Sequence, residues 1–531
     1  MAFRLVTLIA LFFALFGALE AKLYTIQVLK REYYFNKAEA RERFRADLEL
    51  RRGQIFLSDR EGKDFSVALN RDYPIIFSSP RDIEDVSEAA AMLSSVVGWE
   101  ENELKDALSN KKSSFRLLVK KPNETQVKTV EELGIKGIHI DTKQYRAYQY
   151  DGLAAHLVGF VGVNADYDEP VGLYGVEKSE NAKLAAGEDV KLTIDINLQS
   201  KSEELLEELI RDFSATGGTV IIEEPDTGRI VTMASKPDFD PNDYGASPVG
   251  NFVNPAVQAI YEPGSVFKPI TMAIGIEEGV ITPTSTYYDT GKVVLNGKTI
   301  ENWDHKAYGR ISMTRVIERS INTGAVYAES QIGNAKFLEY LKKFGFGEAT
   351  GIGLPDETKG SIRNLESKNA RQIDFATASF GQGTAVTPIQ MVNAFSVLAN
   401  GGLLMRPYIN AEVSPEILRR VLKPETARQV TEMMESAVRE ANVAAIPNYR
   451  VAGKTGTAQV PDFVNGGYSD DLIHTFIGFA PASNPKFVIL IKLDKPDSPL
   501  AGLTVVPAFR KLAEYALNYY RVPPDNLEED Q

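Results

Sequence analysis

The length of the chain constrains its fold more than any other feature of the sequence. A single domain usually holds about 100–200 residues around one core, whereas this chain has 531 residues. We therefore expect at least two domains. Hydrophobic residues make up 44% of the sequence and charged residues 25%, which is typical of globular protein and excludes a mainly disordered or fibrous chain.

The charge balance and two residue types exclude several classes of function. Acidic residues outnumber basic residues by 72 to 59, and the resulting net charge of −13 argues against nucleic acid as a partner. The absence of cysteine excludes disulfides, thiol catalysis and cysteine-based metal sites. Four histidines lie far apart and form no HExxH pattern, which argues against a histidine-based metal site; they are His139, His156, His305 and His474. We expect no metal and no organic cofactor, which leaves catalysis to Ser, Thr, Lys, Asp or Glu.

The amino terminus carries an apolar segment. The uncharged run Leu5–Leu19 spans roughly 22 Å as a helix, short of a hydrocarbon core of about 30 Å. A helix from Leu5 to Leu29 would cross if Glu20 and Lys22 lay at the headgroups. A cleaved signal peptide, a retained signal-anchor and a buried soluble helix all fit this pattern. The segment Ala18–Ala21 is a poor cleavage site, so we favour the retained anchor; local charges leave its orientation open.

The pattern of predicted secondary structure in the rest of the chain changes near residue 189. Before it, strands such as Tyr73–Phe77, a helix near Ile83–Val97 and a turn or loop at Pro122-Asn123-Glu124 predict mixed α/β structure. After it, helices lie between an early and a late block of strands, which predicts one α/β domain whose sheet draws on both blocks. The expected elements are strand Val190–Ile194, helix Asn197–Phe213, hairpin Gly218–Glu223 with Arg229–Ala234, hairpin Thr475–Ala480 with Phe487–Leu493, and helix Val506–Tyr520.

The segment Tyr261–Pro269 contains a Ser-x-x-Lys pair. Pro263-Gly264 marks a helix start, and we expect a helix from Ser265 toward Glu278. Ser265 and Lys268 are three residues apart, so their side chains can touch on one face. A lysine among apolar neighbours loses its proton more easily and can activate a serine. On its own, however, Ser-x-x-Lys is a common chance pattern.

Two further short motifs follow. Ser320-Ile321-Asn322 lies at the end of the helical stretch Met313–Arg319 and, taken alone, is best interpreted as a helix cap. Val451–Ala458 is interpreted as a strand that carries the cation of Lys454, two hydroxyls, and glycines that allow a substrate backbone to approach. A phosphate-binding loop would need glycine at position 448, which is asparagine, so the nucleotide-binding interpretation fails.

Ser-x-x-Lys, Ser-x-Asn and Lys-Thr-Gly in this order resemble the arrangement of penicilloyl-serine transferases. Nearly the whole chain is similar to class B penicillin-binding proteins, monofunctional peptidoglycan D,D-transpeptidases of the division or elongation type. The matching landmarks are Arg52-Gly53-Gln54-Ile55 with Asp59-Arg60 and Gly62, Gly172–Glu177, Thr193-Ile194-Asp195 with Leu198-Gln199, Asn254-Pro255-Ala256, Gly345-Phe346-Gly347, Thr350-Gly351, Gly381-Gln382-Gly383 and Thr387-Pro388. Two departures, the insertion Phe56-Leu57-Ser58 and a missing Gly-Thr around Asn442–Asn448, touch no catalytic residue.

The resemblance implies an α/β (α+β) multi-domain fold. It assigns residues 1–29 to a transmembrane signal-anchor, 30–187 to an elongated mixed α/β pedestal of the dimerisation type, 188–522 to the transpeptidase domain and 523–531 to a polar tail. The transpeptidase domain is expected to hold a mainly antiparallel sheet flanked by helices. A single-pass protein of the plasma membrane is implied, with its catalytic domain on the outer (periplasmic or extracytoplasmic) side.

The resemblance also implies a reaction and its residues. Ser265 would attack the carbonyl between two terminal D-alanines of a stem peptide, and Lys268 is the candidate base. Ser320 would relay a proton, Asn322 would bind the peptide backbone, and Lys454 would supply a positive charge. Thr455, Gly456 and Thr457 would contact the substrate. The backbone N–H groups of Ser265 and Thr457 would form the oxyanion hole. An acceptor amine from a second peptide would then resolve the acyl-enzyme into a crosslink.

Partners and alternatives follow from the same resemblance. The implied partners are stem peptides and their lipid-linked precursor, β-lactams as covalent inhibitors, and a membrane polymerase of the shape, elongation, division and sporulation type with other division or elongation proteins. A D,D-carboxypeptidase, with water as acceptor, and a non-catalytic membrane-anchored β-lactam sensor are the alternatives. The length argues against a β-lactamase, and septal and side-wall roles are not distinguished by these motifs.

Overall fold

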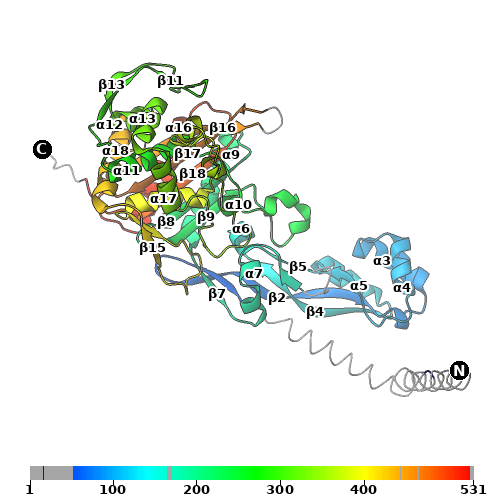
Figure 1. Cartoon of the computed structure of the whole chain (residues 1–531). Helices are drawn as coiled ribbons and strands as arrows, with labels where there is room; N and C mark the ends of the chain where they lie inside the picture. Colours follow the sequence, from blue (N-terminus) through cyan, green and yellow to red (C-terminus); the bar gives the residue numbers. More distant parts are fainter. Residues whose placement is uncertain (1–15, 17–51, 164–169, 443, 463–465, 527–531) are drawn as a thin grey trace, which may run out of the picture. The chain divides into compact units, whose positions relative to one another are not determined.

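The computed structural model describes Phe16 and residues 52–163, 170–442, 444–462 and 466–526 (Figure 1). Contacts divide the chain into two compact units. Unit 1 comprises Met1–Gly53, Asn70–Arg146 and Ala185–Glu188, and unit 2 comprises Gln54–Leu69, Ala147–Leu184 and Asp189–Gln531. Residues 54–69 and 147–184, which the sequence assigns to the pedestal, thus group by contacts with unit 2.

The expected membrane anchor, residues 1–29, lies outside the described residues except for Phe16. Among the helices that the structure does describe, none combines the length and apolar character needed to span a bilayer.

Unit 1 is a small α/β layer. Its strands are β2 (Asp64–Ser78, from Asn70 onward), β3 (Arg116–Lys120) and β4 (Ile138–Tyr148), and β2 pairs with both neighbours. Its helices are α3 (Val86–Val97), α4 (Glu101–Ser109) and α5 (Glu124–Leu133). The turn or loop predicted at Pro122-Asn123-Glu124 comprises Pro122 and Asn123 and leads into α5 at Glu124. The Asn123 and Gln126 side chains bond each other's backbone N–H groups there in a capping box.

Unit 2 contains a short strand pair outside its central sheet. Strand β1 (Ile55–Ser58) pairs antiparallel with the first residues of β2 and parallel with β7 (Val190–Asp195). The strand predicted at Val190–Ile194 therefore exists, but it lies beside β1.

The central sheet of unit 2 has the order β16–β17–β18–β8–β9, and every neighbouring pair is antiparallel. Its strands are β8 (Gly217–Glu224), β9 (Arg229–Lys236), β16 (Ala452–Pro461), β17 (Tyr468–Ala480) and β18 (Phe487–Asp494). The prediction that early and late strands share one sheet is confirmed, and both predicted hairpins are longer than expected. Strand β16 lies at the edge of the sheet.

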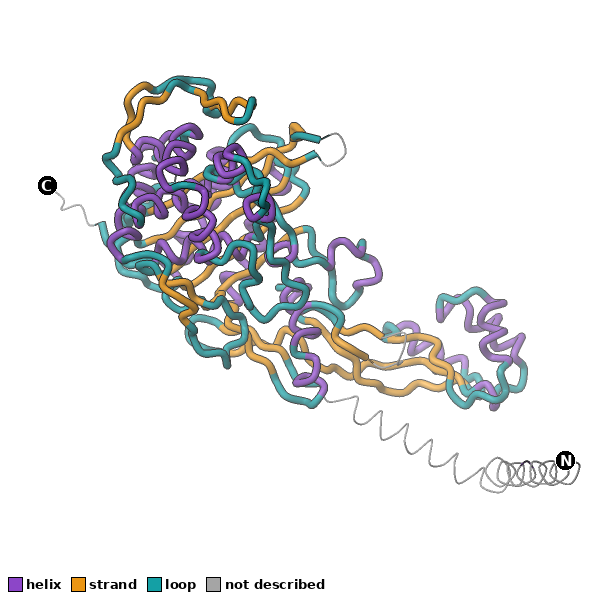
Figure 2. The backbone as a smooth tube through the Cα atoms, in the orientation of Figure 1, coloured by secondary structure: helices purple, strands orange, loops and turns teal. Residues whose placement is uncertain are grey.

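Alternating side chains bury both faces of this sheet. Val220 and Ile222 of β8 pack in one cluster with α9 (Ile196–Phe213) and α19 (Val505–Tyr519), whereas Ile221 belongs to the cluster on the other face. That second cluster includes the buried helices α11 (Lys268–Glu277) and α17 (Pro388–Ala399). Figure 2 shows the helices gathered around the sheet strands.

The remaining elements of unit 2 complete the helical layer and its surface hairpins. The helices are α6 (Ala155–Val158), α7 (Gly175–Ser179), α8 (Asn181–Ala185), α10 (Pro255–Gln258), α12 (Met313–Arg319), α13 (Asn322–Ile332), α14 (Asn334–Lys343), α15 (Arg363–Glu366), α16 (Gln372–Ala378) and α18 (Pro424–Ala441). The short strands are β5 (Val161–Val163), β6 (Pro170–Gly172), β10 (Thr286–Asp289), β11 (Lys292–Leu295), β12 (Lys298–Glu301), β13 (Gly309–Ser312), β14 (Leu403–Met405) and β15 (Ile417–Arg420).

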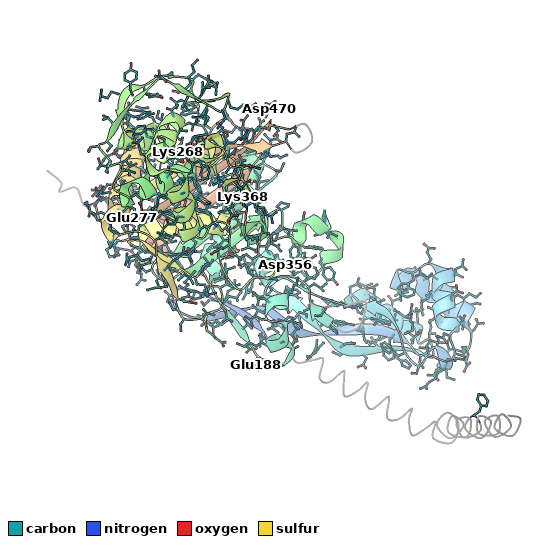
Figure 3. The ribbon with its side chains drawn as sticks, in the orientation of Figure 1. Glu188, Lys268, Glu277, Asp356, Lys368 and Asp470 are labelled. Atoms are coloured by element: carbon teal, nitrogen blue, oxygen red, sulfur yellow. The ribbon has the colours of Figure 1, made fainter. Side chains whose placement is uncertain are left out.

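The helix predicted from Ser265 to Glu278 is split in two. Residues Gly264–Phe267 form a 3₁₀ turn, and the α-helix proper, α11, starts at Lys268 and ends at Glu277. Pro269 occupies the first turn of α11, where its missing N–H costs least. Figure 3 labels Lys268 and Glu277, the first and last residues of this helix.

Candidate active site

Three motifs that are far apart in sequence meet around the amine of Lys268. Ser265 belongs to the 3₁₀ turn before α11, Ser320 and Asn322 lie at the junction of α12 and α13, and Lys454 lies on β16. Lys268 Nζ lies 3.0 Å from Ser265 Oγ, 3.2 Å from Ser320 Oγ and 2.8 Å from Asn322 Oδ1. One buried amine therefore contacts the key side chain of each of the first two motifs.

The environment of Lys268 favours its neutral form. The side chain is fully buried, with 0% of its surface exposed. Burial first, and the nearby charge of Lys454 second, hold the pKa of Lys268 well below its usual range. A neutral amine within hydrogen-bonding distance of a serine hydroxyl can remove its proton, which is what serine nucleophiles require.

The junction of α12 and α13 fixes two of the partners of Lys268. The Ser320 carbonyl oxygen accepts a hydrogen bond of 2.6 Å from Lys268 Nζ. Asn322 Nδ2 donates to the carbonyl oxygen of Glu301 at 2.9 Å, so its Oδ1 faces the amine. The amide of Asn322 is thereby held with its oxygen toward Lys268.

Ser320 adopts a backbone conformation that L-residues seldom occupy. It ends α12 with φ 56° and ψ 44°, in the left-handed region. This conformation costs a non-glycine residue of order 1 kcal/mol, and such strain persists only where the surroundings enforce it. Here the turn directs the Ser320 hydroxyl to both Lys268 and Lys454.

Lys454 completes the group of polar side chains. It is 4% exposed, and burial lowers the pKa of Lys454 to about 7. Its Nζ lies 3.1 Å from Ser320 Oγ and also donates to the carbonyl and hydroxyl oxygens of Thr455, at 3.0 and 3.2 Å. A carboxylate that approached Lys454 would stabilise its charged form and raise that pKa.

Glycines allow β16 to lie against the nucleophile turn. A Cβ atom at Gly456 would lie 2.9 Å from the carbonyl oxygen of Pro263 and 3.1 Å from Val266 Cγ1. Gly264, with φ 61°, donates its N–H to the carbonyl oxygen of Gly381 at 3.0 Å, and a Cβ at Gly381 would lie 2.3 Å from the oxygen of Gly264. Both close approaches require glycine, which explains these residues in the Lys-Thr-Gly and Gly-Gln-Gly motifs.

Glu262 is a site residue that the sequence analysis did not assign. Its Oε1 accepts the backbone N–H of Gly383 and its Oε2 accepts the Tyr468 hydroxyl, each at 2.9 Å. The carboxylate thus joins the turn before Ser265 to the Gly-Gln-Gly loop and to β17. Its place directly before Pro-Gly-Ser was the available signal, but nothing local in the sequence identified its two partners.

His474 lies on β17, beside the strand that carries Lys454. His474 pairs with Thr457 in the register of β16 and β17, is buried beside the Thr504 hydroxyl, and has its pKa lowered to about 4 by burial. Within the described part of the chain, no three His, Cys, Asp or Glu side chains are grouped so that they could hold a metal ion.

Two family descriptions match the sequence. The family described as Penicillin binding protein transpeptidase domain matches residues 218–514, and the one described as Penicillin-binding Protein dimerisation domain matches residues 48–207. The first match covers more than half of the chain.

Individual relatives extend over most of the sequence. The chain is 31% identical to Stage V sporulation protein D of Bacillus subtilis over 517 residues, which cover 89% of this chain and 79% of that protein. It is 26% identical to the Peptidoglycan D,D-transpeptidase FtsI of Escherichia coli over 544 residues, which cover 94% of this chain and 89% of that protein.

Solved structures share the fold at low sequence identity. Penicillin Binding Protein 2X from Streptococcus thermophilus superposes with a TM-score of 0.71 at 20% identity, covering 88% of this chain and 79% of that one. A peptidoglycan synthetase from Bifidobacterium adolescentis superposes with a TM-score of 0.67 at 24% identity, covering 91% and 98% respectively.

Proposed function

The chain belongs to the penicillin-binding protein transpeptidase family, and from this premise we propose how its residues perform the reaction. The protein is a serine-type peptidoglycan D,D-transpeptidase of cell-wall synthesis. The observation that carries the residue assignment is the 3.0 Å contact between the Lys268 amine and the Ser265 hydroxyl. Burial holds the pKa of this lysine well below its usual range.

Acylation starts at Ser265. Lys268 takes the hydroxyl proton as Ser265 Oγ attacks the carbonyl carbon between the two terminal D-alanines of a stem peptide. The negative charge that develops on the carbonyl oxygen is held by the backbone N–H groups of Ser265 and Thr457, and such donors are typically worth about 3–4 kcal/mol each.

The leaving amine receives a proton through Ser320. The hydroxyl of Ser320 lies within 3.2 Å of Lys268 Nζ and 3.1 Å of Lys454 Nζ, so it can pass a proton from the amine side to the departing D-alanine. The C–N bond breaks, free D-alanine leaves, and the remaining peptide stays bound to Ser265 as an ester. An acceptor amine then attacks the ester carbonyl carbon and gives a proton to Lys268. Lys268 passes this proton to Ser265 Oγ as the ester C–O bond breaks and the crosslink forms.

The remaining residues hold the donor peptide. The Asn322 amide, held beside Lys268, binds the peptide backbone. Lys454 attracts the terminal carboxylate, and the hydroxyls of Thr455 and Thr457 donate to it across the close approach that Gly456 allows. A β-lactam, which carries a carboxylate next to a strained amide, acylates Ser265 by the same route and blocks it.

The nucleophile assignment is tested with a fluorescent penicillin. Ser265→Ala is expected to abolish covalent labelling in a protein that retains its melting temperature, and Lys268→Ala is expected to slow labelling by roughly 10²–10⁴-fold, the usual contribution of a general base. Covalent labelling of Ser265→Ala would show that another residue is the nucleophile.

The identity of the acceptor, a peptide amine or water, is tested with purified protein, lipid-linked precursor and a polymerase that acts on this precursor. Crosslinked dimer with stoichiometric release of D-alanine is expected. D-alanine release without dimer would identify a D,D-carboxypeptidase, and penicillin labelling without turnover of any peptide would identify a β-lactam sensor.

The proposal extends to location and assembly. Residues 1–29 form a retained membrane anchor, supported by the uncharged run Leu5–Leu19, and hold the transpeptidase domain (188–522) on the outer side of the plasma membrane. The pedestal (30–187) contacts a lipid-linked-precursor polymerase. Replacing both the anchor and the segment Arg52–Gly62 is expected to preserve penicillin labelling and to abolish co-purification of the polymerase; unchanged co-purification would overturn this contact.

A further inference from the structure

A buried carboxylate lies behind the junction of α12 and α13. Asp289, the last residue of β10, is 1% exposed and accepts four hydrogen bonds. Its Oδ1 accepts from Gly291 N at 2.9 Å and from Thr323 Oγ1 at 2.7 Å, and its Oδ2 accepts from Asn302 Nδ2 at 3.0 Å and from Tyr308 N at 2.9 Å. Each carboxylate oxygen therefore accepts two hydrogen bonds, as many as its lone pairs allow.

The hydroxyl of Thr323 has a defined direction in this group. A carboxylate and an amide oxygen only accept, so the single proton of Thr323 points to Asp289 Oδ1 at 2.7 Å and Asn302 Oδ1 at 3.1 Å. The Tyr287 hydroxyl, 2.9 Å away, must then donate to Thr323 Oγ1. The backbone N–H of Thr323 donates to Asn302 Oδ1 at 3.2 Å. The first turn of α13 is thereby tied to β10 and to the end of β12.

The same turn carries a catalytic side chain. Asn322, the residue before Thr323, is the first residue of α13, and its Nδ2 donates to the carbonyl oxygen of Glu301, the residue before Asn302. Asp289 thus holds both sides of this contact: it anchors Asn302 on one side and Thr323 on the other. The Asn322 amide oxygen, directed away from Glu301, accepts from Lys268 Nζ at 2.8 Å.

We propose that Asp289 and Thr323 are positioning residues for acylation, which hold the Asn322 amide so that its oxygen faces Lys268. The inference rests on the proposed roles of Lys268 and Asn322. It goes beyond them because neither Asp289 nor Thr323 touches the reacting atoms. Figure 1 shows β11 and β13 at the outer edge of unit 2 beside α12 and α13, so the network joins a surface hairpin region to the catalytic amine.

Displacement of the Asn322 amide should change the pH dependence of acylation in a definite direction. The oxygen of Asn322 stabilises the ammonium form of Lys268, as does the carbonyl oxygen of Ser320. The charge of Lys454 on β16 acts on Lys268, whereas the contacts of Lys268 with the junction of α12 and α13 are made to the Ser320 hydroxyl, the Ser320 carbonyl and the Asn322 amide. If the Asn322 oxygen turned away, the ammonium form of Lys268 would lose an acceptor. Acylation slows at low pH because Lys268 gains a proton, and this fall in rate, the acid limb of the pH profile, would then shift to lower pH.

The experiment compares paired threonine variants in the full chain. Thr323→Val removes the hydroxyl, and Thr323→Ser restores it. Thr290→Val is the matched control, because Thr290 follows Asp289 and its hydroxyl donates to the carbonyl oxygen of Lys292. The second-order rate constant of acylation by a fluorescent penicillin is measured from pH 5 to 10, together with the melting temperature.

Thr323→Val is expected to acylate at least 10-fold more slowly, with the acid limb shifted down by about half a pH unit or more. Thr323→Ser is expected to stay within about 3-fold of the natural protein, and Thr290→Val to match it. Asp289→Asn, which places an amide donor against the Asn302 or Tyr308 donor, is expected to behave like Thr323→Val; should it fail to fold, the threonine pair decides alone.

An unchanged pH profile in Thr323→Val, with a rate that falls only as much as the folded fraction, would overturn the proposal and leave Asp289 a structural residue. Lys268→Ala separates this outcome from failure of the proposed mechanism. If Lys268→Ala acylates normally, the mechanism is wrong; if it is inactive while Thr323→Val is normal, only the positioning role is wrong.

Discussion

Lys268 and Lys454 share one hydroxyl: their Nζ atoms lie 3.2 and 3.1 Å from Ser320 Oγ. Burial lowers the pKa of both amines, and the nearby charge of Lys454 lowers the pKa of Lys268 further.

This pairing predicts a bell-shaped pH dependence of acylation. On the acid side, Lys268 gains a proton and can no longer accept one from Ser265. On the basic side, Lys454 loses its charge as the pH rises through about 7 and attracts the carboxylate of a β-lactam less strongly. The second-order rate constant, which reports the free enzyme, is expected to fall on both sides. In Lys454→Arg, which stays protonated, the basic limb near pH 7 should vanish; its persistence would place that limb on another group.

Ser320→Gly is expected to separate stability from activity. Glycine adopts φ 56° without strain, so the free energy of unfolding should rise by up to about 1 kcal/mol. Acylation should nevertheless slow by roughly 10²-fold or more, because the hydroxyl between the two amines is gone. Denaturant unfolding and penicillin labelling measure the two effects. A stable variant of normal reactivity would rule out the relay through Ser320.

Gly456→Ala is expected to move β16 away from the nucleophile turn. The new Cβ would lie 2.9 Å from the backbone oxygen of Pro263, which cannot rotate aside. Acylation should slow by about 10-fold or more, since catalysis is sensitive to displacements near 1 Å. Gly502→Ala is the control, because its Cβ would meet nothing within 4 Å. Equal rates in the two variants would show that this close approach is unimportant.

Glu223→Gln is expected to stabilise the protein in a pH-dependent manner. Glu223 on β8 is fully buried, and burial raises the pKa of Glu223 to about 8. The unfolded carboxyl loses its proton near pH 4.5, so stability falls as the pH rises from there to about 8. At pH 7 the loss is roughly 3 kcal/mol, which glutamine avoids.

Unfolding free energies of Glu223→Gln and of the exposed control Glu514→Gln, measured at pH 5 and pH 7, test this prediction. The advantage of Glu223→Gln over the natural protein should be larger at pH 7 and absent for the control. Equal slopes in all three proteins would mean that Glu223 is ionised in the native state.

The sequence predicted the parts of the fold that local patterns encode. Alternating strands around Pro225–Gly228 and Ser483–Pro485 predicted two hairpins correctly, and the ordered motifs predicted which side chains meet at Lys268. Local patterns did not identify the partner of every strand. The residues of Val190–Asp195 are typical of any strand, and nothing in them indicates that the partner is β1. Likewise, Asp289 and Glu262 act through partners distant in sequence, such as Thr323 and Tyr468.

The edge position of β16 has a consequence for substrate variety. An edge strand presents main-chain N–H and C=O groups that can pair with another extended chain. Hydrogen bonds of this kind are made to the backbone and do not depend on the identity of the bound side chains. We therefore expect the enzyme to tolerate changes in the side chains of the stem peptide, while it remains strict about the D-alanine terminus that must reach Ser265.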